Sequence, residues 1–120
     1  MFNLKITISQ EKINGRKIKI ARLNGFADAS NILEIDQKVK NILLRDNCDL
    51  ILEGSKLKFI NSTFIGELAL WINLLKQKKC KVILVSFLPH VLDTLKAVGL
   101  LKSVLYFDDL AKARAVLAGV

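Results

Sequence analysis

Two short runs of the sequence are entirely apolar, and they constrain the fold more than any other feature. Residues 50–52 and 82–85 contain only leucine, isoleucine and valine, which is typical of strands covered on both faces. Strands of this kind lie in the middle of a parallel sheet with helices packed against it. The two runs therefore predict an α/β protein.

The N-terminal part of the sequence predicts a β-hairpin. Apolar and polar residues alternate over residues 4–9 and again around residues 17–23, which is the period of half-buried strands. Asn14 and Gly15 stand between these segments, and this pair favours a tight hairpin turn because both residues tolerate a positive φ. We expect Gly25 to break the second strand.

Four helices are predicted between and after the strands. Asp28 or Ser30 is expected to cap the first, and Pro89 falls in the first turn of the third, which Gly99 ends. Asp108 is expected to cap the fourth. The second, over residues 64–75, is apolar nearly all round, so it is buried on several sides or presents a face to a partner. The apolar stripes of the first and third comprise Ile32, Ile35, Val39, Ile42, Leu43, Leu92, Leu95 and Val98.

The predicted element order is β-β-α-β-α-β-α-β-α over a single domain of residues 1–120. A loop carrying Gly54 and Ser55 is expected after the strand at residues 50–52, and a last short strand at residues 104–107. Strands that alternate with helices pair in parallel through right-handed crossovers. We expect a mixed, mostly parallel sheet of about five strands with helices packed on it.

Composition excludes several classes of protein. The chain has 120 residues, 52% of them hydrophobic, which suits one folded domain and excludes a disordered tail. Its apolar runs are far shorter than the roughly 20 residues of a membrane span, and its start lacks the pattern of a signal peptide. Cys48, Cys80 and the single histidine, His90, are too few and too scattered for a metal site. We expect a cytoplasmic protein without a metal or cofactor.

No catalytic site is predicted. The sequence has neither a phosphate-binding glycine loop nor a Gly-x-Ser-x-Gly elbow. Ser62 or Ser86 could pair with His90, but nothing marks a third member. Asp108 and Asp109 are explained more simply as a helix cap and a first-turn acid. We therefore assign no catalytic residue and expect a protein that is not an enzyme.

The carboxyl edge of the sheet is the place where we expect function. In parallel α/β sheets, ligands and partners meet the carboxyl ends of the strands. Residues 24–28, 60–63 and 86–90 should share this edge. Cys48 and Cys80 should lie at the opposite edge and be neighbours there, as small buried hydrophobes more than as a redox pair.

Three segments of the sequence resemble landmarks of the STAS domain family. Residues 60–66, which read Ile-Asn-Ser-Thr-Phe-Ile-Gly, resemble its core signature of aspartate, serine, serine or threonine, glycine, a hydrophobe and glycine. Residues 23–28 are similar to its glycine-containing turn, and residues 89–100 to its helix that ends in glycine and leucine. The family includes bacterial anti-sigma factor antagonists and cytoplasmic domains of some anion transporters.

This resemblance implies a protein-binding switch. In the family, a protein kinase of the histidine-kinase-like ATPase class, which is also an anti-sigma factor, phosphorylates the second hydroxyl of the signature. By position that hydroxyl belongs to Thr63, with Ser62 as the second choice. The resemblance further implies a monomer or weak dimer that does not contact membranes. The partner-binding residues that it implies are Gly25, Phe26, Asp28, Asn61, Ser62, Thr63 and Phe64.

Three other functions stay open. Asn61 stands where the family has aspartate and Phe64 where it has glycine, which leaves a phosphorylation-independent STAS scaffold or a small-ligand-binding module as alternatives. The formal charge of +8 raises nucleic-acid binding. However, the densest basic cluster has no arginine and no aromatic residue to stack on bases, which favours a solvated face; it comprises Lys76, Lys78, Lys79 and Lys81.

Overall fold

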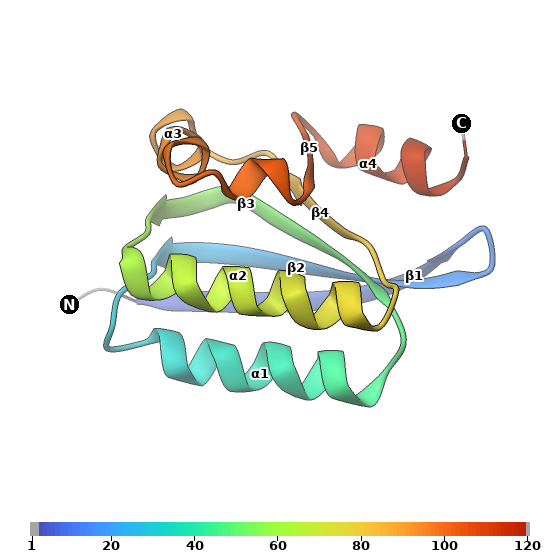
Figure 1. Ribbon diagram of the computed structural model, residues 1–120, viewed down its shortest axis with the longest axis horizontal. Helices are drawn as coiled ribbons and strands as arrows, with labels where there is room; N and C mark the ends of the chain where they lie inside the picture. The colour runs from blue at the N-terminus through green and yellow to red at the C-terminus, as the bar shows by residue number, and fades with distance from the viewer. Residues whose placement is uncertain (1–2, 120) are drawn as a thin grey trace.

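One five-stranded sheet runs through the molecule, in the spatial order β1-β2-β3-β4-β5 (Figure 1). The computed structural model describes residues 3–119, apart from the side chains of residues 43 and 44. Along the chain the elements match the predicted order, with one 3₁₀ turn added. They are β1 (Leu4–Ile13), β2 (Arg16–Phe26), α1 (Ile32–Arg45), β3 (Asp49–Phe59), α2 (Ser62–Gln77), β4 (Val82–Val85), α3 (Pro89–Ala97), the 3₁₀ turn η1 (Leu100–Lys102), β5 (Leu105–Phe107) and α4 (Leu110–Leu117).

The pairing of the strands confirms the mixed, mostly parallel sheet. β1 is antiparallel to β2, whereas β2, β3, β4 and β5 pair in parallel. The predicted hairpin turn is also confirmed, because Ile13 pairs with Arg16. Between them Asn14 and Gly15 have φ values of 54° and 79°.

The prediction that Gly25 breaks the second strand is wrong. Gly25 pairs with Leu4 of β1 and with Leu57 of β3, and β2 continues to Phe26. Gly25 has a φ of 120°, and a Cβ at this position would lie 2.0 Å from the carbonyl oxygen of Asn3. The glycine therefore lets two backbones approach within the sheet and does not end the strand.

The loop predicted around Gly54 is also absent, because β3 runs through it to Phe59. Gly54 is buried, and a Cβ there would lie 2.6 Å from Cδ1 of Phe87. The ring of Phe87 thus occupies the space above a strand residue without a side chain. The register shifts along β2 and β3 show that the strands stay paired beyond Gly54 through local irregularities.

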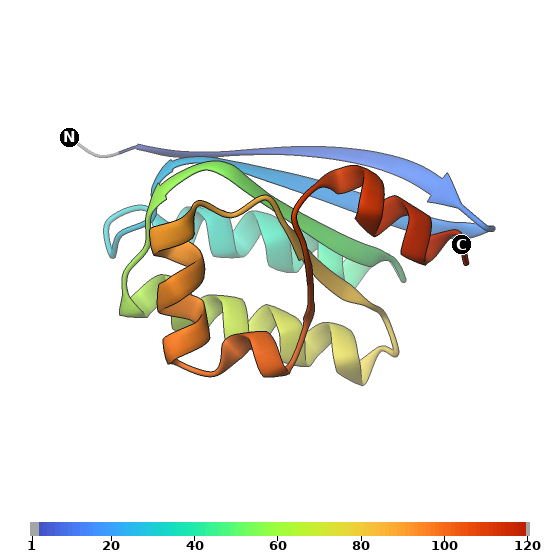
Figure 2. The same ribbon diagram turned by 90° about the horizontal axis from the view of Figure 1, so that it is seen from above.

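Helices cover both faces of the sheet, as the apolar runs predicted. α1 and α2 lie side by side on one face (Figure 1), where they pack with Leu50 and Leu52 in the larger core. Ile51 points to the other face and packs with Ala113 of α4. Figure 2 shows α4 beside the β1–β2 hairpin, where Arg114 pairs with Glu11 at 2.7 Å.

The predicted caps and one stripe need correction. Asn31, not Asp28 or Ser30, is the residue that precedes α1, and Asp109, not Asp108, caps α4 by accepting a hydrogen bond from the Lys112 amide. In the third helix Val91 and Leu95 are buried, whereas the predicted stripe residue Val98 lies beyond the helix end and is exposed. The Asp28 carboxylate instead accepts hydrogen bonds from Ser30, and the Asp108 carboxylate lies 3.5 Å from the Lys112 ammonium group. Of the first helix's predicted stripe, Leu43 lies outside the described side chains.

Candidate functional site at the carboxyl edge of the sheet

The three loops predicted to share the carboxyl edge do meet there. The Ala27 amide donates to the Phe59 carbonyl at 2.9 Å, which ties the turn after β2 to the end of β3. The ring of His90, in the first turn of α3, contacts the Lys58 carbonyl at 2.6 Å through Nε2. These contacts place the turn after β2, the loop before α2 and the start of α3 at one edge.

The loop after β3 leads directly into α2, and the predicted hydroxyl residues begin this helix. Asn61 is the N-cap, and its side chain accepts a hydrogen bond from the Phe64 amide at 3.0 Å. Ser62 and Thr63 follow as the first two helical residues, and both are exposed. Amide groups in the first turn of a helix lack intrahelical partners, and the helix dipole is positive there. This end of α2 therefore presents two hydroxyl groups in an environment that favours an anion.

Phe64 belongs to the core. Its side chain is fully buried and packs edge-to-face on Trp71, with ring centroids 6.0 Å apart. Trp71 in turn donates a hydrogen bond from Nε1 to the Asp36 carboxylate at 2.7 Å. Phe64 thus anchors the start of α2 between the helices and the sheet, which also settles that Trp71 is a core residue.

The turn after β2 is held by a network of side chains and backbone. The Asp28 carboxylate accepts hydrogen bonds from the amide and the hydroxyl of Ser30. These hydrogen bonds, led by the Ser30 hydroxyl, lower the pKa of Asp28 even though desolvation opposes them, so its side chain is ionised near neutral pH. Asn31 clamps the same turn, because its side chain accepts from the Asp28 amide and donates to the Phe26 carbonyl at 2.9 Å.

Sequence reasoning missed Asn31 as a residue that shapes this edge. The signal was available, since asparagine before a helix commonly bonds to nearby backbone. It also missed Lys5 and Lys58, which line a hollow of about 320 Å³ beside Gly25 and Phe26. Nothing in the local sequence indicates that β1 and the end of β3 meet there.

Ser86 and His90, two of the weaker catalytic candidates, form hydrogen bonds with other residues. The Ser86 hydroxyl donates to the Asp108 carbonyl at 2.9 Å, while the His90 ring contacts Lys58. The Asp108 carboxylate lies 3.5 Å from the Lys112 ammonium group, on the surface. Among residues 3–119, no cluster of three or more metal-ligating side chains occurs. In the same range, no helix has the length and apolar character needed to cross a bilayer.

Several solved structures with a similar fold are described as anti-sigma factor antagonists. An anti-sigma factor antagonist from Mycobacterium paratuberculosis is 19% identical, with 94% of each chain covered and a TM-score of 0.78. The anti-sigma factor antagonist SpoIIAA in its unphosphorylated form is also 19% identical, with 95% of this chain and 98% of the other covered and a TM-score of 0.78. The Bacillus cell fate determinant SpoIIAA in its phosphorylated form is 18% identical, with 92% and 99% covered and a TM-score of 0.69.

At 18–19% identity, the similarity to these structures shows only a shared fold. Comparison of the sequence with family models identifies the family. The sequence matches no curated protein. It does match the family model of the STAS domain over residues 9–113. This match spans the second half of β1, all of β2 to β5, the hydroxyl residues at the start of α2 and the turn after β2. The chain therefore belongs to the STAS domain family.

Proposed function

We propose that this protein is a partner-binding switch of the anti-sigma factor antagonist type. It sequesters a protein that is both anti-sigma factor and kinase, of the histidine-kinase-like ATPase class, and phosphorylation of Thr63 releases that partner. The observation that carries the proposal is the pair of exposed hydroxyl groups, Ser62 and Thr63, at the N-terminus of α2 on the carboxyl edge. The fold's relatives support it, because they are named as anti-sigma factor antagonists and SpoIIAA exists in unphosphorylated and phosphorylated forms.

A phosphate at this place would change the surface without unfolding the helix. Phosphorylation adds about −1.5 to −2 charges, and the N-terminus of a helix favours negative charge. Thr63 is exposed, so its hydroxyl group is accessible to a kinase, whereas the next residue, Phe64, is fully buried in the core. The switch would therefore act on the partner through charge and bulk.

Asn61 fits this proposal although the family has aspartate at its position. An amide oxygen and a carboxylate oxygen can both accept the Phe64 amide hydrogen bond, so the cap is retained. Asparagine carries no charge, which removes one source of repulsion for a phosphate on the next residues. We propose that Asn61 positions the hydroxyl residues and that Phe64 positions the helix from the core.

The partner would bind across the two elements of this edge. Gly25 and Phe26 end β2, Asp28 lies in the turn after it, and the Ala27–Phe59 hydrogen bond holds that turn next to the start of α2. Asp28 contributes a fixed negative charge to the surface. On this proposal the protein acts in the cytoplasm as a monomer or weak dimer and needs no catalysis of its own.

The test is reconstitution with the histidine-kinase-like ATPases of the same genome. Each is mixed with this protein, with and without ATP, and the mixture is analysed by size-exclusion chromatography and intact mass. We expect a complex without phosphate, and one added phosphate that is lost in Thr63→Ala but kept in Ser62→Ala. Thr63→Asp should weaken the complex. Absence of both a complex and a phosphate with every candidate would overturn the proposal.

A phosphorylation-independent scaffold is the second candidate. Asn61 and the buried Phe64 at signature positions favour it, because both alter the surroundings of the hydroxyl group. A stable complex that ATP neither dissolves nor marks with phosphate would select the scaffold over the switch.

A further inference from the structure

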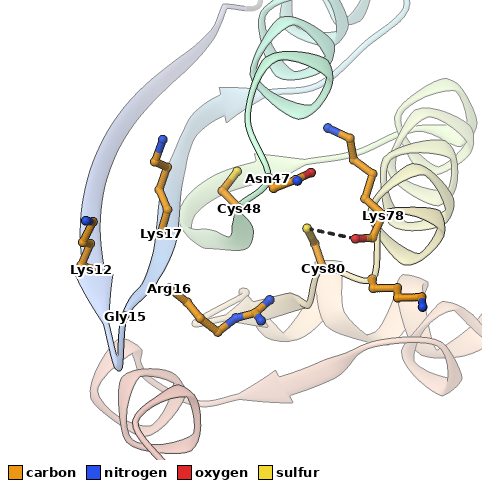
Figure 3. A pocket seen from close by; sticks show the side chains of 9 residues that line it. Lys12, Gly15, Arg16, Lys17, Asn47, Cys48, Lys78 and Cys80 are labelled. Carbon is orange, nitrogen blue, oxygen red and sulfur yellow. Dashed lines mark hydrogen bonds between the residues drawn. The ribbon is translucent and has the colours of Figure 1, made fainter.

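A basic pocket of about 470 Å³ opens at the edge of the sheet opposite Thr63 (Figure 3). Its wall comes from three segments that are far apart in the sequence: the β1–β2 hairpin, the loop before β3 and the loop between α2 and β4. A volume of this size lies within the range of small-molecule sites. Five cationic side chains line it, which are Lys12, Arg16, Lys17, Lys78 and Lys79.

The positive charge of the pocket exceeds the negative charge near it. Arg16 binds the buried Asp49 carboxylate through two hydrogen bonds of 2.8 and 2.7 Å. Lys17 lies 3.7 Å from the Asp46 carboxylate. Within residues 3–119, neither Lys12 nor Lys79 takes part in an ion pair, and no aspartate or glutamate lines the pocket. A surplus of cations therefore surrounds the space.

Two thiols lie between the cationic walls. Cys48 and Cys80 stand just before neighbouring strands, each two residues ahead of one member of the Leu50–Val82 pair. The two cysteines therefore occupy equivalent positions before β3 and β4. Figure 3 shows both side chains between the hairpin and the end of α2. Burial, reinforced by the Cys80 thiol nearby, raises the pKa of Cys48, so this thiol stays neutral and leaves the positive charge of the pocket undiminished.

The end of α2 at this edge is its C-terminus, which by itself repels anions. The amide of Lys78 donates to carbonyl groups of the last turn, and the amide of Cys80 donates to the Leu75 carbonyl at 2.9 Å. Several of the last carbonyl groups are thereby satisfied within the chain. The attraction for an anion comes from side chains gathered by the fold and not from a helix end.

We propose that this pocket binds a small anion with two or more linked phosphate groups. The cations stand on two separate segments, the β1–β2 hairpin and the end of α2 with its following loop. Cations on opposite sides of a pocket are matched by several negative charges spread over a chain, whereas a single oxyanion would reach only one or two of them. The shared chemistry is the phosphate chain, either free or esterified to a small molecule. The site lies apart from the hydroxyl residues of α2 and does not depend on the proposed switch.

The test is calorimetric titration with tripolyphosphate at about 150 mM salt, where diffuse attraction between exposed charges is largely screened. The double variant Lys12→Gln/Lys79→Gln should weaken binding about tenfold, since exposed charge pairs each contribute modestly. The control Lys56→Gln/Lys96→Gln removes the same charge at exposed positions outside the pocket, and its affinity should stay within about twofold of wild type. Circular dichroism checks that each variant is folded.

Backbone amide NMR shifts give a second readout, and we expect them at residues 47–48 and 78–80. No tripolyphosphate binding, an equal loss in both double variants, or shifts centred on the start of α2 would each overturn the proposal.

Affinity for orthophosphate equal to that for tripolyphosphate would overturn the requirement for linked phosphates. Equal affinity for tripolyphosphate and adenosine triphosphate supports recognition of the free chain, and tighter binding of adenosine triphosphate supports an esterified one. Binding of adenosine triphosphate alone overturns the proposal.

Discussion

Gly54 offers the sharpest test of the packing on the sheet, through the substitution Gly54→Ala. The added Cβ would lie 2.6, 2.7 and 3.0 Å from three ring carbon atoms of Phe87, so the ring must move. The Phe87 ring packs edge-to-face on Tyr106 with centroids 6.4 Å apart, and the Phe87 amide donates to the Tyr106 hydroxyl at 3.1 Å. With Phe87 only 6% exposed, little free space is available for that movement.

Two opposing effects set the size of the loss. Overpacking of a well-filled core costs about 1–3 kcal/mol, while replacing glycine by alanine within a strand returns about 0.5–1 kcal/mol of backbone entropy. Because two of the contacts are shorter than 3.0 Å, we place the overpacking cost in the upper part of its range and expect the free energy of unfolding to fall by about 1–2 kcal/mol. For a domain of this length that corresponds to a decrease in Tm of roughly 4–8 °C.

The same substitution at Gly66 is the matched control. Gly66 lies within α2, and a Cβ there would meet no atom within 4 Å. Gly66→Ala should therefore raise the free energy of unfolding by about 0.5–1 kcal/mol, because alanine favours the helix. Both variants are measured by urea unfolding and thermal melts followed by circular dichroism.

A double-mutant cycle assigns the loss to the ring. In a Phe87→Leu background, Gly54→Ala should cost at least about 1 kcal/mol less than in the wild type, since the clash is relieved. Two results would refute this account: a Tm of Gly54→Ala equal to or above that of the wild type, or additive effects of the two substitutions.

Three further predictions concern buried charge and the β1–β2 contact. A hydrogen bond with Asp36, burial and the Asp36 charge raise the pKa of Glu67. The stability that its protonated form contributes is therefore lost as pH rises through that pKa. In urea unfolding, Glu67→Gln should have a higher free energy of unfolding than the wild type, and the difference should be larger at pH 8 than at pH 5. Although burial opposes it, hydrogen bonding to Arg16 lowers the pKa of Asp49. Breaking a fully buried ion pair costs about 3–5 kcal/mol, but the Arg16 side chain is 49% exposed, so Arg16→Gln should cost about 2–3 kcal/mol near neutral pH. This cost should shrink as acid protonates Asp49, and an unchanged cost would contradict the pairing. Gly25→Ala should lower Tm by more than Gly54→Ala, because its Cβ would meet the backbone of Asn3 at 2.0 Å, and differential scanning calorimetry measures the order.

Some of the candidate site was within reach of the sequence. The placement of Ser62 and Thr63 at the start of a helix follows from local patterns alone, since polar capping residues precede a long apolar stretch. Their position at the same sheet edge as the turn after β2 follows from the parallel topology. The role of Phe64 did not follow, because an aromatic side chain beside a hydroxyl reads equally well as core or as interface until Trp71 is placed against it.

Local patterns were enough to predict the class of fold, the hairpin turn at Asn14 and Gly15, and the order of strands and helices, because these depend on periodicity and on the φ preferences of single residues. The lengths of β2 and β3 could not be predicted in this way, because the places of Gly25 and Gly54 within the strands are explained by contacts with Asn3 and Phe87, which are distant in sequence. The basic pocket also depends on the tertiary structure, because there Lys78 and Lys79, which the sequence indicated only as part of a solvated cluster, lie near Lys12 and Arg16 of the hairpin. Such contacts arise from long-range packing, which local patterns do not encode.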